Sequence, residues 1–281
     1  MRILVTGAGG LLAPDVLEVA RTRGHECLGV TRRELDVTDA PGVEGMVRAH
    51  NPDAVVHCAA YTDVDRAEAE PALAMRVNRN GAEHVARACA SVGAVMVYVS
   101  TDYVFSGPRD RPWSVDEGTR PANHYALTKA EGERMVAASG PEHVIARVSW
   151  LFGAPRPTFV DAMLKRAAAG EGLRLVHDQF STPTWSRSAA LTLLELLERG
   201  ARGTFHVTDG GGAASRLDFA LEALRIRGID VPIEPVPNGT FREAALRPPY
   251  TVLDVSATEA FLGRPMPGWR TTLERYLRGG S

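Results

Sequence analysis

The sequence predicts an α/β fold in which a doubly wound parallel sheet is followed by a smaller C-terminal domain. Short apolar segments alternate with amphipathic helical patterns through the first half of the chain, as strands covered by helices on both faces require. A glycine-rich turn follows the first apolar segment, and the second half is less regular. Right-handed crossovers between such strands place helices on both faces of one sheet. We expect residues 1–150, completed by parts of 185–210, to form the sheet domain, and 151–281 to form mainly the second domain, interleaved with the first.

The first half contains five expected strands and three expected long helices. The first helix has Pro14 in its first turn and Gly24 as its stop. Asp65, followed by Glu68, resembles a capping box that opens a further helical region. The expected strands are 2–6, 26–30, 54–58, 94–99 and 144–148, and the expected helices are 14–23, 41–50 and 73–92.

The second half combines helical patterns with short strands and proline-bearing segments. We expect the segments at 231–237 and 247–250 to be loops that close over a site, because functional loops in compact domains have this character. The expected helices are 158–169, 187–199 and 215–227, and the expected strands are 173–176 and 204–207.

Composition and charge exclude several classes of function. The 281 residues are 44% hydrophobic and carry a net charge of −2, so there is no basic surface for nucleic acid or for a membrane. No apolar stretch approaches the ~20 residues of a membrane span. The three cysteines suit free thiols in a reducing cytoplasm, and the eight histidines lack metal-ligand spacing. We therefore expect a cytoplasmic protein without a metal site; a homodimer stays open.

The glycine-rich turn indicates the class of cofactor. Gly7, Gly9 and Gly10 follow the first strand, and Leu11 and Leu12 lead into the first helix. Glycines here permit a tight turn and let the backbone approach a pyrophosphate, which is bound by the free N–H groups at the helix N-terminus. At the first strand–helix junction of a parallel pattern, this turn is typical of a Rossmann dinucleotide-binding domain.

The end of the second strand favours NADPH, although NADH stays possible. An acidic residue there would bind a ribose 2′-hydroxyl, but this chain has Thr31, Arg32 and Arg33. Two guanidiniums can bind a 2′-phosphate, or they are ordinary solvated charges. Asp36, followed by Val37, would either accept a hydrogen bond from the adenine amine or cap its own turn.

Thr101, Tyr125 and Lys129 predict proton transfer at a carbonyl. Tyr125 and Lys129 are spaced i, i+4, so on a helix they lie on one face. The unperturbed tyrosine pKa is about 10. A nearby ammonium lowers it. With a hydroxyl at Thr101, the group suits interconversion of a ketone and an alcohol.

Nine motifs give the chain a family resemblance from residue 3 to about residue 254. The chain resembles the dTDP-4-dehydrorhamnose reductase family of the extended short-chain dehydrogenase/reductases, which are sugar-nucleotide ketoreductases. The motifs are VTGAGGLL, HCAAYTDVDRAE, VNRNGAEHVARAC, VSTDYVFSG, YALTKAEGE, RVSWLFG, HDQFSTPT, FHVTDGGGAASRLDFA and RPPYTVLD.

The resemblance implies residue roles. It implies that Thr101, Tyr125 and Lys129 form a catalytic triad, and that Lys129 also holds the nicotinamide ribose and lowers the pKa of Tyr125. The cofactor would be lined by Ala59, Ala60, Tyr61 and Ser100 as well as by the glycine turn. The substrate, a nucleotide sugar, would be bound by Thr62, Val64, Thr101, Asp102, Tyr103, Trp150 and Arg247.

The reaction implied is reduction of a 4-keto-6-deoxysugar linked to dTDP, with dTDP-4-dehydrorhamnose as the leading substrate. Related dehydratases need Asp-Glu where this chain has Asp102-Tyr103, so elimination lacks its base. An epimerase, or a non-catalytic subunit resembling that of methionine adenosyltransferase, remains an alternative. Some relatives bind magnesium at a dimer interface. The two acidic residues that bind it correspond to Asp15 and Arg187 in this chain. An arginine cannot ligate a metal, so we do not expect a magnesium site here.

Several further residues have structural interpretations. Asn78 is either a hydrogen-bonding residue near the site or part of a helix bend. Arg147, on an expected strand, should be buried and paired. Ser181 stands where the family usually has glycine, which leaves the local backbone open.

Overall fold

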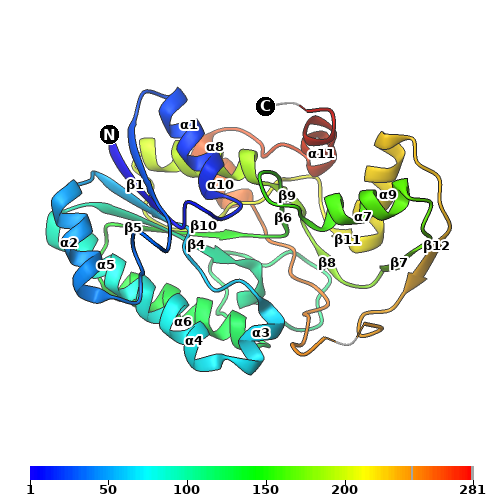
Figure 1. Cartoon of the computed structure of the whole chain (residues 1–281), viewed down its shortest axis with the longest axis horizontal. Helices are drawn as coiled ribbons and strands as arrows, with labels where there is room; N and C mark the ends of the chain where they lie inside the picture. The colour runs from blue at the N-terminus through cyan, green and yellow to red at the C-terminus, as the bar shows by residue number, and fades with distance from the viewer. Residues whose placement is uncertain (242, 280–281) are drawn as a thin grey trace.

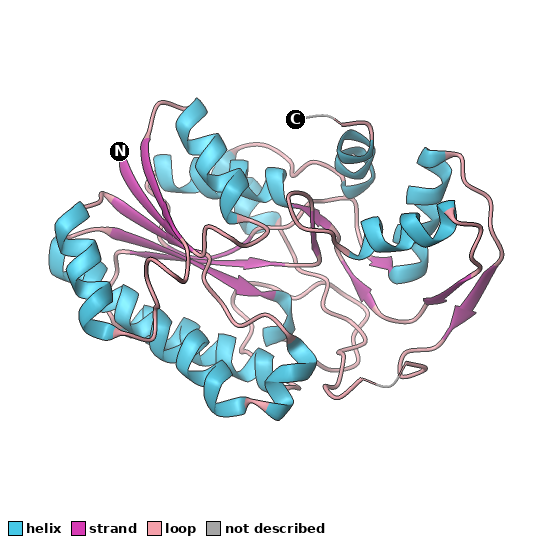
Figure 2. Cartoon of the chain, viewed as in Figure 1, coloured by secondary structure: helices cyan, strands magenta, loops and turns pink. Residues whose placement is uncertain are grey.

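The computed structural model describes residues 1–241 and 243–279, and it confirms the α/β fold with a parallel central sheet. Six strands lie in the order β10-β5-β4-β3-β1-β2, and every neighbouring pair is parallel (Figures 1 and 2). The strands are β1 (Arg2–Thr6), β2 (Glu26–Val30), β3 (Ala54–His57), β4 (Val95–Thr101), β5 (His143–Val148) and β10 (Gly203–His206).

Alternation along the strands produces two apolar layers. Ile3 and Val5 of β1 face one layer, whereas Leu4 between them faces the other, as the period of a strand requires. The first layer lies under α1 (Ala13–Thr22) and α8 (Ser186–Glu198). The second lies under α2 (Ala40–His50), α5 (Gly81–Val92) and α6 (His124–Ala138), on the opposite side in Figure 1.

Residues from the second half of the chain complete the sheet. Strand β10 pairs with β5 in the register Gly203↔Val144 to His206↔Arg147, and α8 packs against α1. The chain therefore returns to the sheet after leaving it.

A third apolar cluster, separate from the two layers of the sheet, lies beyond the carboxyl ends of the strands, at the right of Figure 1. It joins α7 (Phe159–Ala168), α9 (Arg216–Arg227) and α11 (Trp269–Leu277). Three two-stranded sheets border it: β7 (Leu173–Val176) with β12 (Ile233–Val236), β8 (Phe180–Ser181) with β11 (Ala214–Ser215), and β6 (Leu151–Phe152) with β9 (Thr184–Trp185). Helix α10 (Ser256–Leu262) packs beside β10.

The structure corrects three expected elements. The N-cap of α3 (Val64–Ala69) is Asp63, whose side chain accepts from the Arg66 N–H, so the expected Asp65–Glu68 capping box is wrong. The expected helix 73–92 is three pieces, α4 (Pro71–Met75), the π-helical turn Arg76–Asn80 and α5, because Asn78 in the turn is held by tertiary contacts. The expected loop at 231–237 contains β12, an edge strand that tolerates proline.

No helix among the described residues is long and apolar enough to cross a membrane. Cys27, Cys58 and Cys89 are all free. Within 1–241 and 243–279 there is no cluster of three or more potential metal ligands.

Candidate active site

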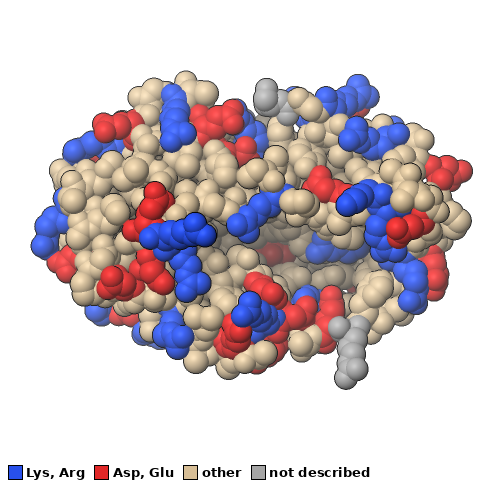
Figure 3. Space-filling model, viewed as in Figure 1, with Lys and Arg blue, Asp and Glu red and all other residues tan. Residues whose placement is uncertain are grey.

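Most of the expected site residues follow the carboxyl ends of β1, β2, β3, β4 and β5, the edge at which ligands bind in open α/β sheets. Figure 3 shows the molecular surface hollowed at this place, between the sheet and the α7–α9 part of the chain.

The glycine turn lies close against the end of β3. Gly7 has a positive φ of 72°, and a Cβ there would lie 2.6 Å from the Ala59 nitrogen, so only glycine fits. Gly9 faces open space, and Gly10 donates to the Gly7 carbonyl at 2.8 Å. No side chain caps the start of α1 at Leu12, so its first N–H groups are available to an anion. The turn therefore fits a dinucleotide pyrophosphate.

The segment after β2 supports its own backbone and presents two arginines. The Thr31 N–H and hydroxyl both donate to Glu34 at 2.8 Å. Asp36 accepts from the N–H and hydroxyl of Thr38, and these bonds hold the pKa of its carboxyl below the usual value. Of the two roles open to Asp36, the structure shows the turn cap.

The arginines themselves are exposed. Arg32 has a side chain 76% exposed and lies 3.5 Å from Asp36, a separation that is worth little at the surface. Arg33 is exposed and makes no ion pair with a described residue. Val37 is buried against Gly81, so it supports the segment from beneath.

Asn78 fixes the loop after β3. Its side-chain oxygen accepts from the Tyr61 N–H at 2.8 Å, and its amide donates to the Tyr61 carbonyl and to the Thr128 hydroxyl. Ala59 and Ala60 lie half-buried in this loop. The Tyr61 hydroxyl donates to Glu70 at 2.8 Å. Asn78 therefore serves both roles left open for it, since a hydrogen-bonding residue and a helix irregularity occur together. Such π-helical turns are frequent at functional sites.

Thr101 and Tyr125 meet where β4 ends and α6 begins. Thr101 is the last residue of β4, and Tyr125 lies in the first turn of α6, which Asn123 caps by accepting from the Ala126 N–H. Burial raises the pKa of Tyr125, and the neighbouring Thr101 hydroxyl acts in the opposite direction. The phenol is therefore fully protonated at neutral pH.

Lys129 is buried one helical turn after Tyr125. Its ammonium donates to the Val99 carbonyl at 2.7 Å and lies 4.0 Å from the centre of the Tyr98 ring. Burial lowers the pKa of Lys129 to about 7. The expected lowering of the Tyr125 pKa by Lys129 is wrong for this conformation, because the lysine faces Val99 and burial dominates at the tyrosine.

Asp102 forms a buried cluster of hydroxyl groups and does not reach toward a ligand. One carboxylate oxygen accepts from Thr251 at 2.5 Å, Ser181 at 2.8 Å and Ser149 at 3.1 Å, and the other accepts from Thr101 at 3.1 Å. Burial raises the pKa of Asp102. Four protein hydroxyls occupy its carboxylate oxygens, so this side chain supports the end of β4, and the expected substrate contact of Asp102 stays a prediction. Ser181, where the family usually has glycine, supplies one of them.

Ser100 also turns away from the hollow. Its hydroxyl donates to Glu133 at 2.5 Å, and Glu133 is paired with Arg147 at 2.8 Å. The hydroxyl is therefore engaged within the protein, and the expected contact of Ser100 with the cofactor stays a prediction for its backbone. Arg147 is buried and paired, as expected.

Tyr103 and Trp150 lie on the substrate side of the hollow. The Tyr103 ring meets the Tyr125 ring edge-on, with centroids 6.3 Å apart. Its hydroxyl accepts from Gln179 at 3.4 Å. Trp150, directly after β5, adopts a left-handed backbone with φ of 37°, a strained state for a bulky residue that is concentrated at functional sites.

The remaining expected substrate contacts lie on and beside α3. Thr62 is exposed before the helix, and Val64, its first residue, is half-buried. Arg247 pairs with Asp65 at 2.7 Å, so this arginine joins the 244–247 loop to α3.

Sequence reasoning missed Gln179 and Arg216, which lie beside Tyr103 and Trp150. Gln179 donates to Tyr103, and the guanidinium of Arg216 lies 3.9 Å from the centre of the Trp150 ring. Both lie within quoted motifs, HDQFSTPT and FHVTDGGGAASRLDFA, but the motifs do not show that these segments meet Tyr103 and Trp150. Arg187, at the position excluded for magnesium, pairs with Glu18 at 2.9 Å and lies 3.9 Å from Asp15.

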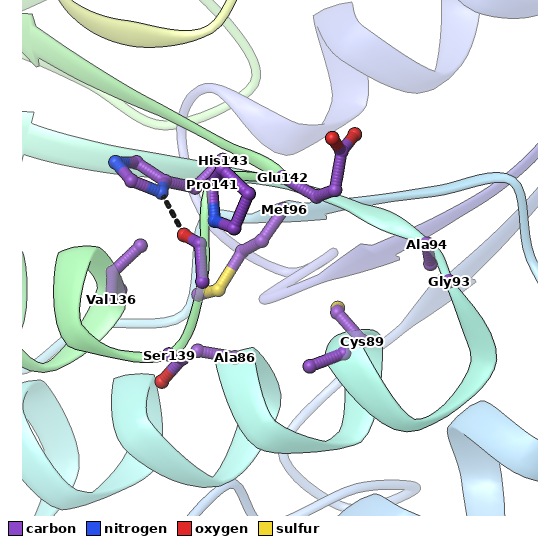
Figure 4. Close-up of a pocket in the computed structure, with 12 residues that line it drawn as sticks. Ala86, Cys89, Gly93, Ala94, Met96, Val136, Ser139, Pro141, Glu142 and His143 are labelled. Atoms are coloured by element: carbon purple, nitrogen blue, oxygen red, sulfur yellow. Dashed lines mark hydrogen bonds between the residues drawn. The ribbon is translucent and has the colours of Figure 1, made fainter.

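A separate pocket lies at the opposite, amino ends of β4 and β5, between the ends of α5 and α6 (Figure 4). Its walls are mainly apolar. Burial raises the pKa of Cys89 there to about 12, so the thiol is unreactive, and the His143 ring binds the Gly140 carbonyl at 2.7 Å. The expected site residues lie at the other end of the sheet.

Residues 1–280 match the family described as RmlD substrate binding domain. The chain is 40% identical to dTDP-4-dehydrorhamnose reductase of Streptomyces griseus, over 97% of this chain and 91% of that one. It is 37% identical to the enzyme of that name from Mycolicibacterium smegmatis, over 97% and 84%.

Comparison with solved structures gives the same family. A dTDP-4-dehydrorhamnose reductase from Clostridium acetobutylicum superposes with a TM-score of 0.95 at 34% identity, covering 99% of both chains. The Bacillus anthracis enzyme of that name, solved in complex with NADP, gives 0.95 at 33% and the same coverage. The chain therefore belongs to the RmlD substrate binding domain family, as its motifs predict.

Proposed function

We propose that the protein catalyses the NADPH-dependent reduction of the 4-keto group of a dTDP-4-keto-6-deoxysugar, with dTDP-4-dehydrorhamnose reduced to dTDP-L-rhamnose as the leading reaction. The observation that carries the proposal is the arrangement of Thr101 and Tyr125 at the carboxyl end of β4, with Lys129 one turn further along α6. The full-length relatives named dTDP-4-dehydrorhamnose reductase support the substrate.

Tyr125 is the proton donor. Because burial raises its pKa, the phenol holds its proton at neutral pH until the keto oxygen gains negative charge. Transfer of that proton gives the alcohol and leaves a phenolate. Lys129, whose pKa of about 7 lets it release a proton near neutral pH, would return a proton to the phenolate once its ammonium leaves the Val99 carbonyl. Thr101, bonded to Asp102 and to the Tyr103 N–H, keeps a fixed hydroxyl beside the phenol.

The glycine turn and the segment after β2 would hold the dinucleotide. Gly7, Gly9 and Gly10 give its pyrophosphate access to the start of α1, and Arg32 and Arg33 would bind a 2′-phosphate. When bound, the cofactor supplies the hydride that reduces the keto carbon. The NADP in the B. anthracis relative supports NADPH for this chain. NADH remains the weaker alternative.

The division of labour follows the two parts of the chain. We assign cofactor binding to residues 1–150 with parts of 185–210, and substrate binding mainly to 151–281. The three free cysteines support a reducing, cytoplasmic location. A homodimer is compatible with this assignment.

Purified protein with NADPH and enzymatically prepared dTDP-4-keto-6-deoxysugars provides the test. We expect loss of NADPH absorbance that depends on the sugar, and a product with the mass of the alcohol. An epimerase would interconvert sugars without net NADPH consumption, and a regulatory subunit would show neither reaction. If NADPH is not oxidised with any of these sugars, the proposal is contradicted.

A further inference from the structure

We propose that Arg216 binds the diphosphate of the nucleotide sugar and thereby fixes the substrate across the hollow. This inference rests on the proposed function and adds a residue that the motifs do not assign.

The start of α9 holds Arg216 beside the catalytic strands. Its predecessor, Ser215, caps the helix by accepting from the Asp218 N–H at 3.0 Å, and Asp218 binds Ser215 in return. Strand β11 pairs with β8 so that Ala214 lies opposite Ser181. Because Ser181 donates to Asp102, the start of α9 is connected through this pair to the end of β4.

The guanidinium of Arg216 is held by aromatic rings and by no acid. It lies 3.9 Å from the centre of the Trp150 ring and 4.9 Å from that of Phe159. Among the described residues, no carboxylate lies within ion-pair distance and no group forms a hydrogen bond with it. Burial lowers the pKa of Arg216, although the group stays charged. A partly buried cation without an anionic partner is costly, so a bound anion would compensate it.

Arg247 provides the contrast. Burial raises the pKa of Tyr103, and the positive charges of Arg216 and Arg247 both act in the opposite direction. Arg247, however, pairs with Asp65 at 2.7 Å and lies 3.7 Å from Glu243. Arg247 is therefore in direct contact with a carboxylate, whereas the carboxylates that act on Arg216, those of Asp102 and Glu243, do so from beyond ion-pair distance. Of the two arginines, Arg216 is the one whose N–H groups are available.

Trp150 supports a ligand at the same place. Trp150 has a strained backbone two residues after the end of β5, and its buried ring nitrogen has no hydrogen-bond partner among the described residues. The ring thus serves as a platform for Arg216, which limits the guanidinium to few orientations and lowers the entropy lost on binding.

The chemistry of the substrate calls for a cation that is separate from the proton donor. In a nucleotide sugar the diphosphate is attached at C1, and the keto carbon C4 lies across the pyranose ring. Tyr103 connects the two regions, since its ring meets that of Tyr125 edge-on and the charge of Arg216 is near enough to influence its pKa. A planar guanidinium binds adjacent phosphate oxygens in bidentate fashion, which an ammonium cannot do.

Calorimetry with dTDP and with thymidine separates a phosphate contact from packing. For Arg216→Ala we expect dTDP affinity to fall ~10- to 100-fold, as for loss of charged hydrogen bonds. Thymidine affinity should stay within about twofold, and Arg216→Lys should fall between the wild type and Arg216→Ala. The matched control is Arg270→Ala, because Arg270 also stacks on a tryptophan, 4.2 Å from the Trp269 ring, and should leave both affinities unchanged.

Three results would overturn the assignment. Equal losses for dTDP and thymidine in Arg216→Ala would make the residue a packing element, and unchanged dTDP binding would remove it from the site. Wild-type protein that binds dTDP no more tightly than thymidine would also contradict it. NADPH binding, measured in parallel, should be unaffected and reports on folding. Wild-type NADPH oxidation tests the proposed reaction separately, so failure of one is distinguishable from failure of the other.

Discussion

The expected cofactor side of the hollow is built from residues that are close together in the sequence, whereas the expected substrate side is built from residues that are far apart. On the cofactor side, the glycine turn joins β1 to α1, and the Arg32–Arg33 segment directly follows β2. On the substrate side, Asp102 alone gathers hydroxyls from Ser149, Ser181 and Thr251. The first side depends on local backbone geometry, and the second on contacts that exist only once the chain has folded. Changes on the two sides should therefore fail in different ways.

Loss of the proton donor should have the largest effect on activity and leave both sides intact. Tyr125→Phe removes one hydroxyl from a packed ring, so turnover should fall by ~10²–10⁴-fold, the usual contribution of a positioned general acid. NADPH and dTDP affinities should stay near wild type. Steady-state kinetics together with calorimetry measure both quantities, and near-normal turnover would exclude Tyr125 from the mechanism.

On the cofactor side, Gly7→Ala should disrupt local geometry. A Cβ at Gly7 would lie 2.6 Å from the Ala59 nitrogen, and the residue would keep a positive φ, so the turn must move. We expect a loss of about 2–4 kcal/mol in the free energy of unfolding, together with weaker NADPH binding. Denaturant titration measures the first and fluorescence the second.

Gly9→Ala is the matched control for this change. A Cβ at Gly9 meets nothing within 4 Å, so stability should hardly change. If both glycine variants lose equal stability, the close approach of Gly7 to Ala59 does not determine the fold of the turn.

The same contrast explains how much the sequence could predict. The parallel strands, the glycine turn and the Tyr125–Lys129 pair follow from periodicity and short spacing, and the structure contains them. Asp102 and Ser100 look like ligand contacts in their motif, yet they turn inward because Ser181, Thr251 and Glu133 arrive from elsewhere. The directions of side chains at a strand end depend on these partners, which no local pattern specifies.

Lys129 should make stability depend on pH. Burial lowers its pKa to about 7, from a usual value near 10.5. Between these values the unfolded chain binds a proton that the folded protein does not, so stability should rise as pH increases from about 7 toward 10. Lys129→Met should reduce this slope and should be relatively more stable than the wild type at pH 7. Denaturant titrations across this range test it; an unchanged slope would mean that the lysine keeps its ordinary pKa.

The exposed arginines should have the smallest effect, and they test whether the cofactor side also selects its ligand. Arg32 and Arg33 extend into solvent, where each charge contact is weakened by water and salt. Replacing both with alanine should raise the NADPH dissociation constant by about tenfold, roughly 1.4 kcal/mol, because a 2′-phosphate contact is lost. The NADH dissociation constant should hardly change, since that ligand lacks the phosphate. Arg48→Ala, an exposed arginine on α2 paired only with Glu44, is the control and should alter neither. Raised salt should narrow the difference between NADPH and NADH in the wild type and not in the double variant. Equal losses for both dinucleotides would show that this segment supports the fold of the turn and does not read the 2′-position.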